Sequence, residues 1–221
     1  MFISKKTLFA AACTFVLSAP AFAGVSLSSL FGGGTLTSDN GLLEFSDFQY
    51  TPIRNAPAAA DIDIQTLDSG LLFGTPIFTD SSTGFIDFGI SYKVSGIGAS
   101  IVSAQMQSTG SGFNGGAAGV IKVVEGSEGQ GLANLINSFS SSTTLSNVSA
   151  LLAPQDSIYV RDDVFALPGQ GVAALSDFSQ VFGTTTEGET AGPTAVPSPT
   201  AALAGVLLLG AIGVRRRRDS K

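Results

Sequence analysis

The sequence predicts an all-β protein, an antiparallel β-sandwich or jelly roll, on two observations. Apolar and polar residues alternate with a period of two over most of residues 24–183, which is typical of strands that bury one face. Clusters rich in glycine, serine, asparagine and aspartate separate these stretches and favour turns. Because 221 residues suffice for one domain with a sizeable core, we expect a single sandwich over residues 24–183.

The clearest strand is "FIDFGISYKV", in which apolar residues alternate with polar or small ones. The five residues expected to face the core are Ile86, Phe88, Ile90, Tyr92 and Val94. Further strands are predicted at residues 43–50, 62–67, 97–106, 119–124, 157–167 and 172–182. One short helix is predicted in "GLANLINSF", from Leu132 to Phe139. Sixteen phenylalanines fit an apolar core between two sheets.

The composition removes several kinds of chemistry. The chain has no histidine, and its one cysteine, Cys13, lies in a segment that we expect to be removed. A serine triad, a thiolate metal site and a disulfide are therefore not expected. Residues 24–196 hold four basic residues against sixteen acidic ones, a net charge of −12. Such a body repels nucleic acid, so no nucleic-acid partner is predicted.

Paired carboxylates are the only candidates for a ligand site. Asp61 and Asp63 stand two apart in "DID", so on one strand they would share a face and could hold calcium or flank a glycosidic bond. Adjacent Asp162 and Asp163 would project to opposite faces of a strand. We favour the interpretation that both pairs lie on solvated surfaces, which predicts no enzyme activity, no cofactor and no metal. A calcium-dependent carbohydrate-binding module that uses Asp61, Asp63 or the Asp162 region is the alternative.

The N-terminus predicts export. Residues 1–23 have a basic start, an apolar run from Leu8 to Leu17, and the Ala21-Phe22-Ala23 sequence of a signal-peptidase site, with Gly24 as the first mature residue. The run is about half of the roughly 20 residues that span a bilayer, which disfavours a permanent anchor. The expected partners are therefore the Sec machinery and signal peptidase.

The C-terminus has three parts. A linker of threonine, glycine and proline is predicted at 184–195. It precedes the sequence Val196, Pro197, Ser198, Pro199, then an apolar segment at 201–214, then Arg215, Arg216, Arg217 and Arg218. As a helix the apolar segment is about 21 Å long against a hydrocarbon core of roughly 30 Å, short for a permanent anchor. The arginines would keep its end in the cytoplasm. A permanently tail-anchored surface protein is the alternative.

This tail, residues 196–221, resembles the PEP-CTERM sorting signal of bacteria that make exopolysaccharide, with Ser198 where the usual motif has glutamate. The resemblance implies recognition by a membrane-embedded exosortase, which cuts near the proline motif and releases the protein to the envelope exterior. The stretch "LSSLFGGGTLTSDNGLLEFSDFQY" is similar to the opening of β-rich proteins with that tail. The expectation is a non-enzymatic cell-envelope or extracellular-matrix protein, transiently held in the membrane through 201–214 and associated with exopolysaccharide.

Overall fold

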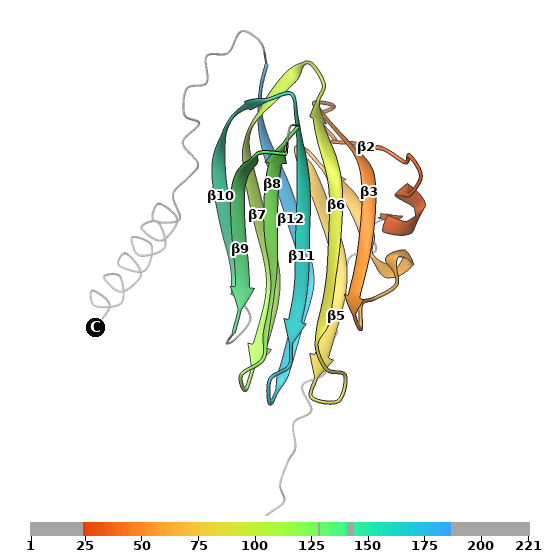
Figure 1. The fold of residues 1–221 in the computed structure, drawn as a ribbon, viewed down its shortest axis with the longest axis vertical. Coiled ribbons are helices and arrows are strands. Elements are labelled where there is room, and N and C mark those ends of the chain that lie inside the picture. The colour runs from red at the N-terminus through yellow and green to blue at the C-terminus, as the bar shows by residue number, and fades with distance from the viewer. Residues whose placement is uncertain (1–23, 128, 141–143, 187–221) are drawn as a thin grey trace, which may run out of the picture.

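Two antiparallel sheets of six strands each pack face to face in this protein (Figure 1). The computed structural model describes residues 24–127, 129–140 and 144–186. The predicted all-β sandwich is therefore confirmed. None of the helices within these residues is long and apolar enough to cross a membrane.

Sheet A has the order β1-β4-β5-β12-β7-β10, and sheet B has the order β2-β3-β6-β11-β8-β9. The strands of sheet A are β1 (Val25–Ser26), β4 (Asp63–Leu67), β5 (Gly70–Asp80), β12 (Val172–Thr186), β7 (Ala99–Phe113) and β10 (Thr144–Gln155). Those of sheet B are β2 (Leu36–Thr37), β3 (Leu43–Arg54), β6 (Ile86–Gly96), β11 (Ser157–Leu167), β8 (Ala117–Gly126) and β9 (Gly131–Phe139). Two short 3-10 helices, η1 (Leu27–Leu30) and η2 (Ala59–Asp61), complete the described chain.

The strands from β5 to β12 give the sandwich its topology. Successive strands change sheet at every step except between β8 and β9. The resulting orders, β5-β12-β7-β10 and β6-β11-β8-β9, are those of an eight-stranded jelly roll. Strands β1, β4, β2 and β3 extend the two sheets at one edge. Because most neighbouring strands of the jelly roll are distant in the sequence, residues from separate parts of the chain meet on each face.

The core lies between the sheets and is rich in aromatic rings. The five residues predicted to face inward from β6 are all at most 4% exposed, which confirms the alternation. Phe73 of sheet A stacks on Phe178 with a centroid distance of 4.7 Å and contacts Tyr92 of sheet B at 5.8 Å. These rings connect the two sheets, so we expect them to contribute strongly to stability.

Several elements differ from the sequence prediction. The predicted helix from Leu132 to Phe139 is wrong, because this segment is strand β9 and pairs with β8. Its apolar residues recur at a spacing that also fits a helix, but in the strand Leu135 is buried while Ile136 is 62% exposed. Strands β5 and β10 were not predicted. The last strand, β12, continues to Thr186, beyond the predicted end at residue 182.

Candidate functional site

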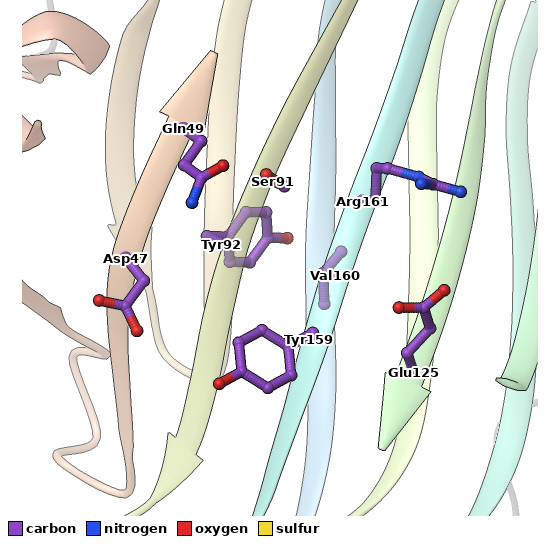
Figure 2. A pocket seen from close by; sticks show the side chains of 8 residues that line it. All are labelled: Asp47, Gln49, Ser91, Tyr92, Glu125, Tyr159, Val160 and Arg161. Carbon is purple, nitrogen blue, oxygen red and sulfur yellow. The ribbon is translucent and has the colours of Figure 1, made fainter. Parts of the chain in front are cut away.

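An open depression of about 200 Å³ lies on the outer face of sheet B, across β3, β6, β11 and β8 (Figure 2). Outward side chains from these four strands surround it, while two interior residues form its floor. The lining residues are Asp47, Gln49, Ser91, Tyr92, Glu125, Tyr159, Val160 and Arg161. We call the outward members of this set, with Lys93, the sheet B face.

Strand β11 provides the centre of the sheet B face. Ile158 and Val160 point into the core and are at most 1% exposed, so the alternation of the strand turns Tyr159 and Arg161 outward. Tyr159 is 42% exposed. Its phenol ring therefore lies on the surface of the central part of a sheet, where neighbouring strands hold it on both sides.

The strand register arranges the sheet B face in two neighbouring rows. In one row Ser91 lies between its partners Gln49 of β3 and Arg161 of β11. In the next row Tyr159 lies between its partners Lys93 of β6 and Glu125 of β8. Side chains directly opposite one another on antiparallel strands have Cβ atoms about 5 Å apart. The two rows thus place amide, hydroxyl, guanidinium, ammonium and carboxylate groups around one aromatic ring.

A β-bulge in β3 places Asp47 at the rim of the depression. The register moves from Ser46 opposite Lys93 to Gln49 opposite Ser91, which leaves one extra residue in β3. Asp47 takes a positive φ of 56° at this point. The bulge lets Phe48 turn inward and stack on Tyr92 at a centroid distance of 5.5 Å. It thereby adds an outward carboxylate without opening the core.

The side chains of the sheet B face can both donate and accept hydrogen bonds. Arg161, Gln49 and Lys93 donate, and the carboxylates of Asp47 and Glu125 accept. An exposed aromatic ring offers an apolar surface on which a flat ligand stacks. A ligand that carries many hydroxyl groups and has an apolar flat side would satisfy both properties.

A pair of carboxyl groups adjoins the sheet B face. Asp163, opposite Gly89, lies on the same outer surface of β11 as Tyr159, and Asp87 lies one row further on β6. Partial burial raises the pKa of Asp87, and the charge of Asp163 and a hydrogen bond with it add to the rise, while Arg54 opposes it. The Asp87 carboxyl group therefore holds a proton more readily than an isolated aspartate does, which gives this end of the face a hydrogen-bond donor.

Asp61 and Asp63 do not form the pair that their spacing predicted. Asp61 ends the 3-10 helix η2, whereas Asp63 begins β4, so they are not two residues of one strand. Both are exposed. Asp61 lines a second small depression with Pro57, Ile62, Thr75 and Pro76, and Asp63 does not. Within the residues that the structure describes, no group of three or more metal-ligating residues occurs.

Asp162 and Asp163 project to opposite faces, as predicted, but Asp162 is not solvated. It is fully buried between the sheets, together with Lys122. The signal for this burial was in the sequence, because Asp162 alternates in register with Ile158, Val160 and Val164. The same alternation places Tyr159, Arg161 and Asp163 on the outer face, although the prediction did not single out Tyr159 or Arg161.

No family model and no curated protein matches this sequence. Solved structures with a similar arrangement include TmCBM61 in complex with β-1,4-galactotriose, at 11% identity and a TM-score of 0.36 over 62% of this chain and 90% of that one. The CBM22-1 xylan-binding domain of Paenibacillus barcinonensis Xyn10C is 10% identical, with a TM-score of 0.27 over 62% of this chain and 94% of that domain. The N-terminal cellulose-binding domain of Cellulomonas fimi β-1,4-glucanase C is 9% identical, with a TM-score of 0.26 over 63% of this chain and 90% of that domain. Likeness of this degree carries no argument about a ligand, which has to come from the residues of the sheet B face.

The predicted signals lie outside the described residues. This holds for the N-terminal segment with Ala21 and Ala23, although Gly24 is described, and for Val196 to Pro199, the apolar segment 201–214 and Arg215 to Arg218. The export and sorting predictions therefore stay predictions.

Proposed function

We propose that this protein is a non-enzymatic, exported β-sandwich whose sheet B face binds a neutral glycan. The observation that carries the proposal is Tyr159, an exposed aromatic ring on a central strand of sheet B, which lies between Lys93 and Glu125 and next to a second row of hydrogen-bonding side chains. No step of covalent chemistry on the glycan is part of the proposal.

The chemistry of a sugar matches the two properties of this face. One side of a pyranose ring carries C–H groups and stacks on an aromatic ring, as other flat apolar groups do. Its hydroxyls donate and accept hydrogen bonds, and carboxylates, amides and guanidinium groups bind them with directional preference. Glu125 and Lys93 flank Tyr159 directly, while Arg161 and Gln49 stand one row away. A sugar stacked on Tyr159 would have partners on both sides.

The charge of the protein favours a neutral glycan over an acidic one. Residues 24–196 carry a net charge of −12, so a polyanionic chain would meet long-range repulsion. On the sheet B face itself the carboxylates of Asp47 and Glu125 are matched in number by Arg161 and Lys93, so the face adds no net positive charge that would attract a polyanion. We therefore expect the ligand to be a neutral polysaccharide of the cell envelope or matrix. Its binding should not require calcium.

The sequences of the two ends of the chain support a proposal for how this domain is exported and sorted. We infer that the signal peptide is cleaved before Gly24, and that an exosortase-like enzyme processes the tail at Val196 to Pro199 while residues 201–214 hold the chain in the membrane. The protein then reaches the cell surface, where a neutral exopolysaccharide is the natural ligand for the sheet B face.

Calorimetric titration with neutral oligosaccharides and with a polyanionic glycan of matched length tests the binding proposal. Tyr159→Ala should weaken binding about 30-fold, equivalent to about 2 kcal/mol at a central aromatic contact. Phe78→Ala is the matched control, since Phe78 is an aromatic ring of sheet A that is 59% exposed. Equal loss in both variants, or binding of the polyanion alone, would contradict the proposal. Binding abolished by a calcium chelator would favour the calcium-dependent alternative.

The mature ends of the native protein test the delivery proposal. Mass spectrometry of the protein from the cell surface or medium should find Gly24 as the first residue and a C-terminus near Pro199. Intact Arg215 to Arg218 in the membrane fraction would instead show a permanently anchored protein.

A further inference from the structure

Four polar side chains meet in the interior of the sandwich, where apolar packing is the rule. Lys122 of β8, Asp162 of β11 and Gln180 of β12 are 0% exposed, and Tyr92 of β6 is 1% exposed. Gln180 comes from sheet A and the other three from sheet B, so the cluster bridges the two layers. This cluster lies on the inner side of strands whose outer side forms the sheet B face, and Tyr92 also belongs to the floor of the depression on that face.

Lys122 and Asp162 are direct cross-strand neighbours. They are paired in the register of β8 and β11, and both point into the interior. Directly opposed residues have Cβ atoms about 5 Å apart, a separation that a lysine side chain joined to an aspartate side chain spans easily. The Lys122 Nζ lies 4.3 Å from the centroid of the Phe182 ring, which covers it from sheet A.

One hydrogen bond connects members of this cluster, and four of its polar atoms have no hydrogen-bond partner. Gln180 Nε2 donates to Asp162 Oδ1 at 2.7 Å. The atoms without a hydrogen-bond partner include Lys122 Nζ, Asp162 Oδ2, Gln180 Oε1 and Tyr92 Oη. Buried polar atoms in folded proteins are almost always paired, so a group of four at one place requires an explanation. An ammonium and a carboxylate in this state would be especially costly.

Burial drives both charged groups toward their neutral forms. Desolvation lowers the pKa of Lys122 to about 8, although the charge of Asp162 opposes the change. Desolvation raises the pKa of Asp162 to about 7, against the effects of Lys122 and of the Gln180 hydrogen bond. A neutral amine is a nucleophile and a neutral carboxyl group accepts its attack, whereas the ammonium carboxylate salt is unreactive.

We propose that Lys122 and Asp162 condense to form an isopeptide bond that joins β8 to β11 inside the sandwich. The neutral Nζ attacks Cγ of the protonated Asp162 carboxyl group, and the C–N bond forms. Oδ2 then leaves as water with one proton from the carboxyl group and one from the amine, so the C–O bond breaks and the atoms balance. No oxidant, metal or second substrate is needed.

Gln180 is matched to both the reaction and its product. Its Nε2–H already donates to Oδ1, the oxygen on which negative charge develops in the tetrahedral intermediate. After condensation Oδ1 becomes the amide carbonyl and keeps this bond. The bond uses Lys122 Nζ and removes Asp162 Oδ2, which accounts for two of the four unpaired atoms. The Phe182 ring shields the amide from water.

A covalent connection of this kind also fits the rest of the chain. The sequence has one cysteine, Cys13, so no disulfide can join two strands of the sandwich. An amide between side chains would supply a cross-link that does not depend on the redox state of the surroundings.

The intact mass of the folded full chain, with its ends fixed by peptide mapping, tests the proposal. The mass should be lower than the sequence requires by one water molecule, and trypsin should fail to cut after Lys122 and should yield a peptide in which Lys122 is joined to Asp162. Lys122→Met should restore the sequence mass, and Lys93→Met, on the outer face of the same sheet, should keep the deficit.

Gln180→Met should slow formation of the bond, so that a smaller fraction of freshly folded chains shows the deficit. An unmodified mass for the folded wild-type protein would overturn the proposal, whether or not any variant folds. Asn137 of β9, the strand next to β8, is also buried, at 1% exposed. A deficit of one ammonia with Asn137 joined to Lys122 would also overturn the assignment to Asp162.

Discussion

Replacing the interior polar cluster by apolar side chains of similar volume should destabilise this protein, contrary to the usual effect of such a change. The variant carries Lys122→Met, Asp162→Val and Gln180→Met and keeps Tyr92, so that none of the three replaced positions is left as an unpaired buried group. In other proteins, replacing a buried ion pair by well-packed apolar residues is often neutral or stabilising by about 1 to 4 kcal/mol. The proposed isopeptide bond reverses the expected sign.

The size of the loss follows from the loop that the bond closes. Lys122 and Asp162 are 40 positions apart, and a cross-link over about 40 residues restricts the unfolded chain by about 4 kcal/mol in the chain-entropy treatment used for disulfides. For a domain of this size that loss lowers Tm by roughly 10 °C. Apolar packing by the three new side chains would stabilise the variant and so offset part of this loss.

Unfolding in guanidinium chloride, followed by circular dichroism, measures the difference. The variant should unfold at a lower denaturant concentration than the wild type, whereas the control Lys93→Met should behave as the wild type does. A triple variant as stable as the wild type, or more stable, would refute the reasoning that the cluster is a cross-link.

Two further predictions concern the core and a turn. Phe73→Ala should lower the free energy of unfolding by about 3 to 5 kcal/mol, since Phe73 is fully buried and stacks on Phe178; a loss under 1 kcal/mol in chemical denaturation would contradict the packing. Asp80 accepts hydrogen bonds from Ser82 and Thr83, which lower its pKa to about 2. Its folded pKa lies below the unfolded value, so the carboxylate stabilises the turn above about pH 4 and this contribution is lost as pH falls through about 2. An NMR titration midpoint near 4 for Asp80 would contradict these bonds.

The alternation of the sequence was sufficient to predict the strands that bury one clean apolar face. Strand β11 has the bounds that were predicted, and β6 buries the five residues expected of it. Strand β5 was missed because Thr75 and Thr79 face the interior while Phe78 faces outward, which obscures the period of two.

Local pattern alone could not assign β9. Apolar residues at 132, 135, 136 and 139 satisfy the spacing of a helix as well as part of a strand. Pairing with β8, whose residues lie between 6 and 21 positions away from their partners in β9, decides between the two. Tertiary pairing of this kind is not visible in a window of nine residues.

The candidate sites were hidden for a different reason. Charged residues were expected at the surface, so Lys122 and Asp162 were not considered as interior neighbours, although each alternates with buried valines. The sheet B face combines residues from β3, β6, β8 and β11 that are up to about 110 positions apart in the sequence. Only the strand order of the sandwich brings them together.

The central claim is that the sheet B face binds a neutral glycan, and chemical-shift mapping tests it most directly. Titration of the 15N-labelled protein with a neutral oligosaccharide that binds should shift backbone amides of Gln49, Ser91, Glu125, Tyr159 and Arg161. The amides of Phe78 and of its neighbours in sheet A should stay unchanged. Shifts confined to sheet A or to the loops, with the Tyr159 region unaffected, would contradict the account.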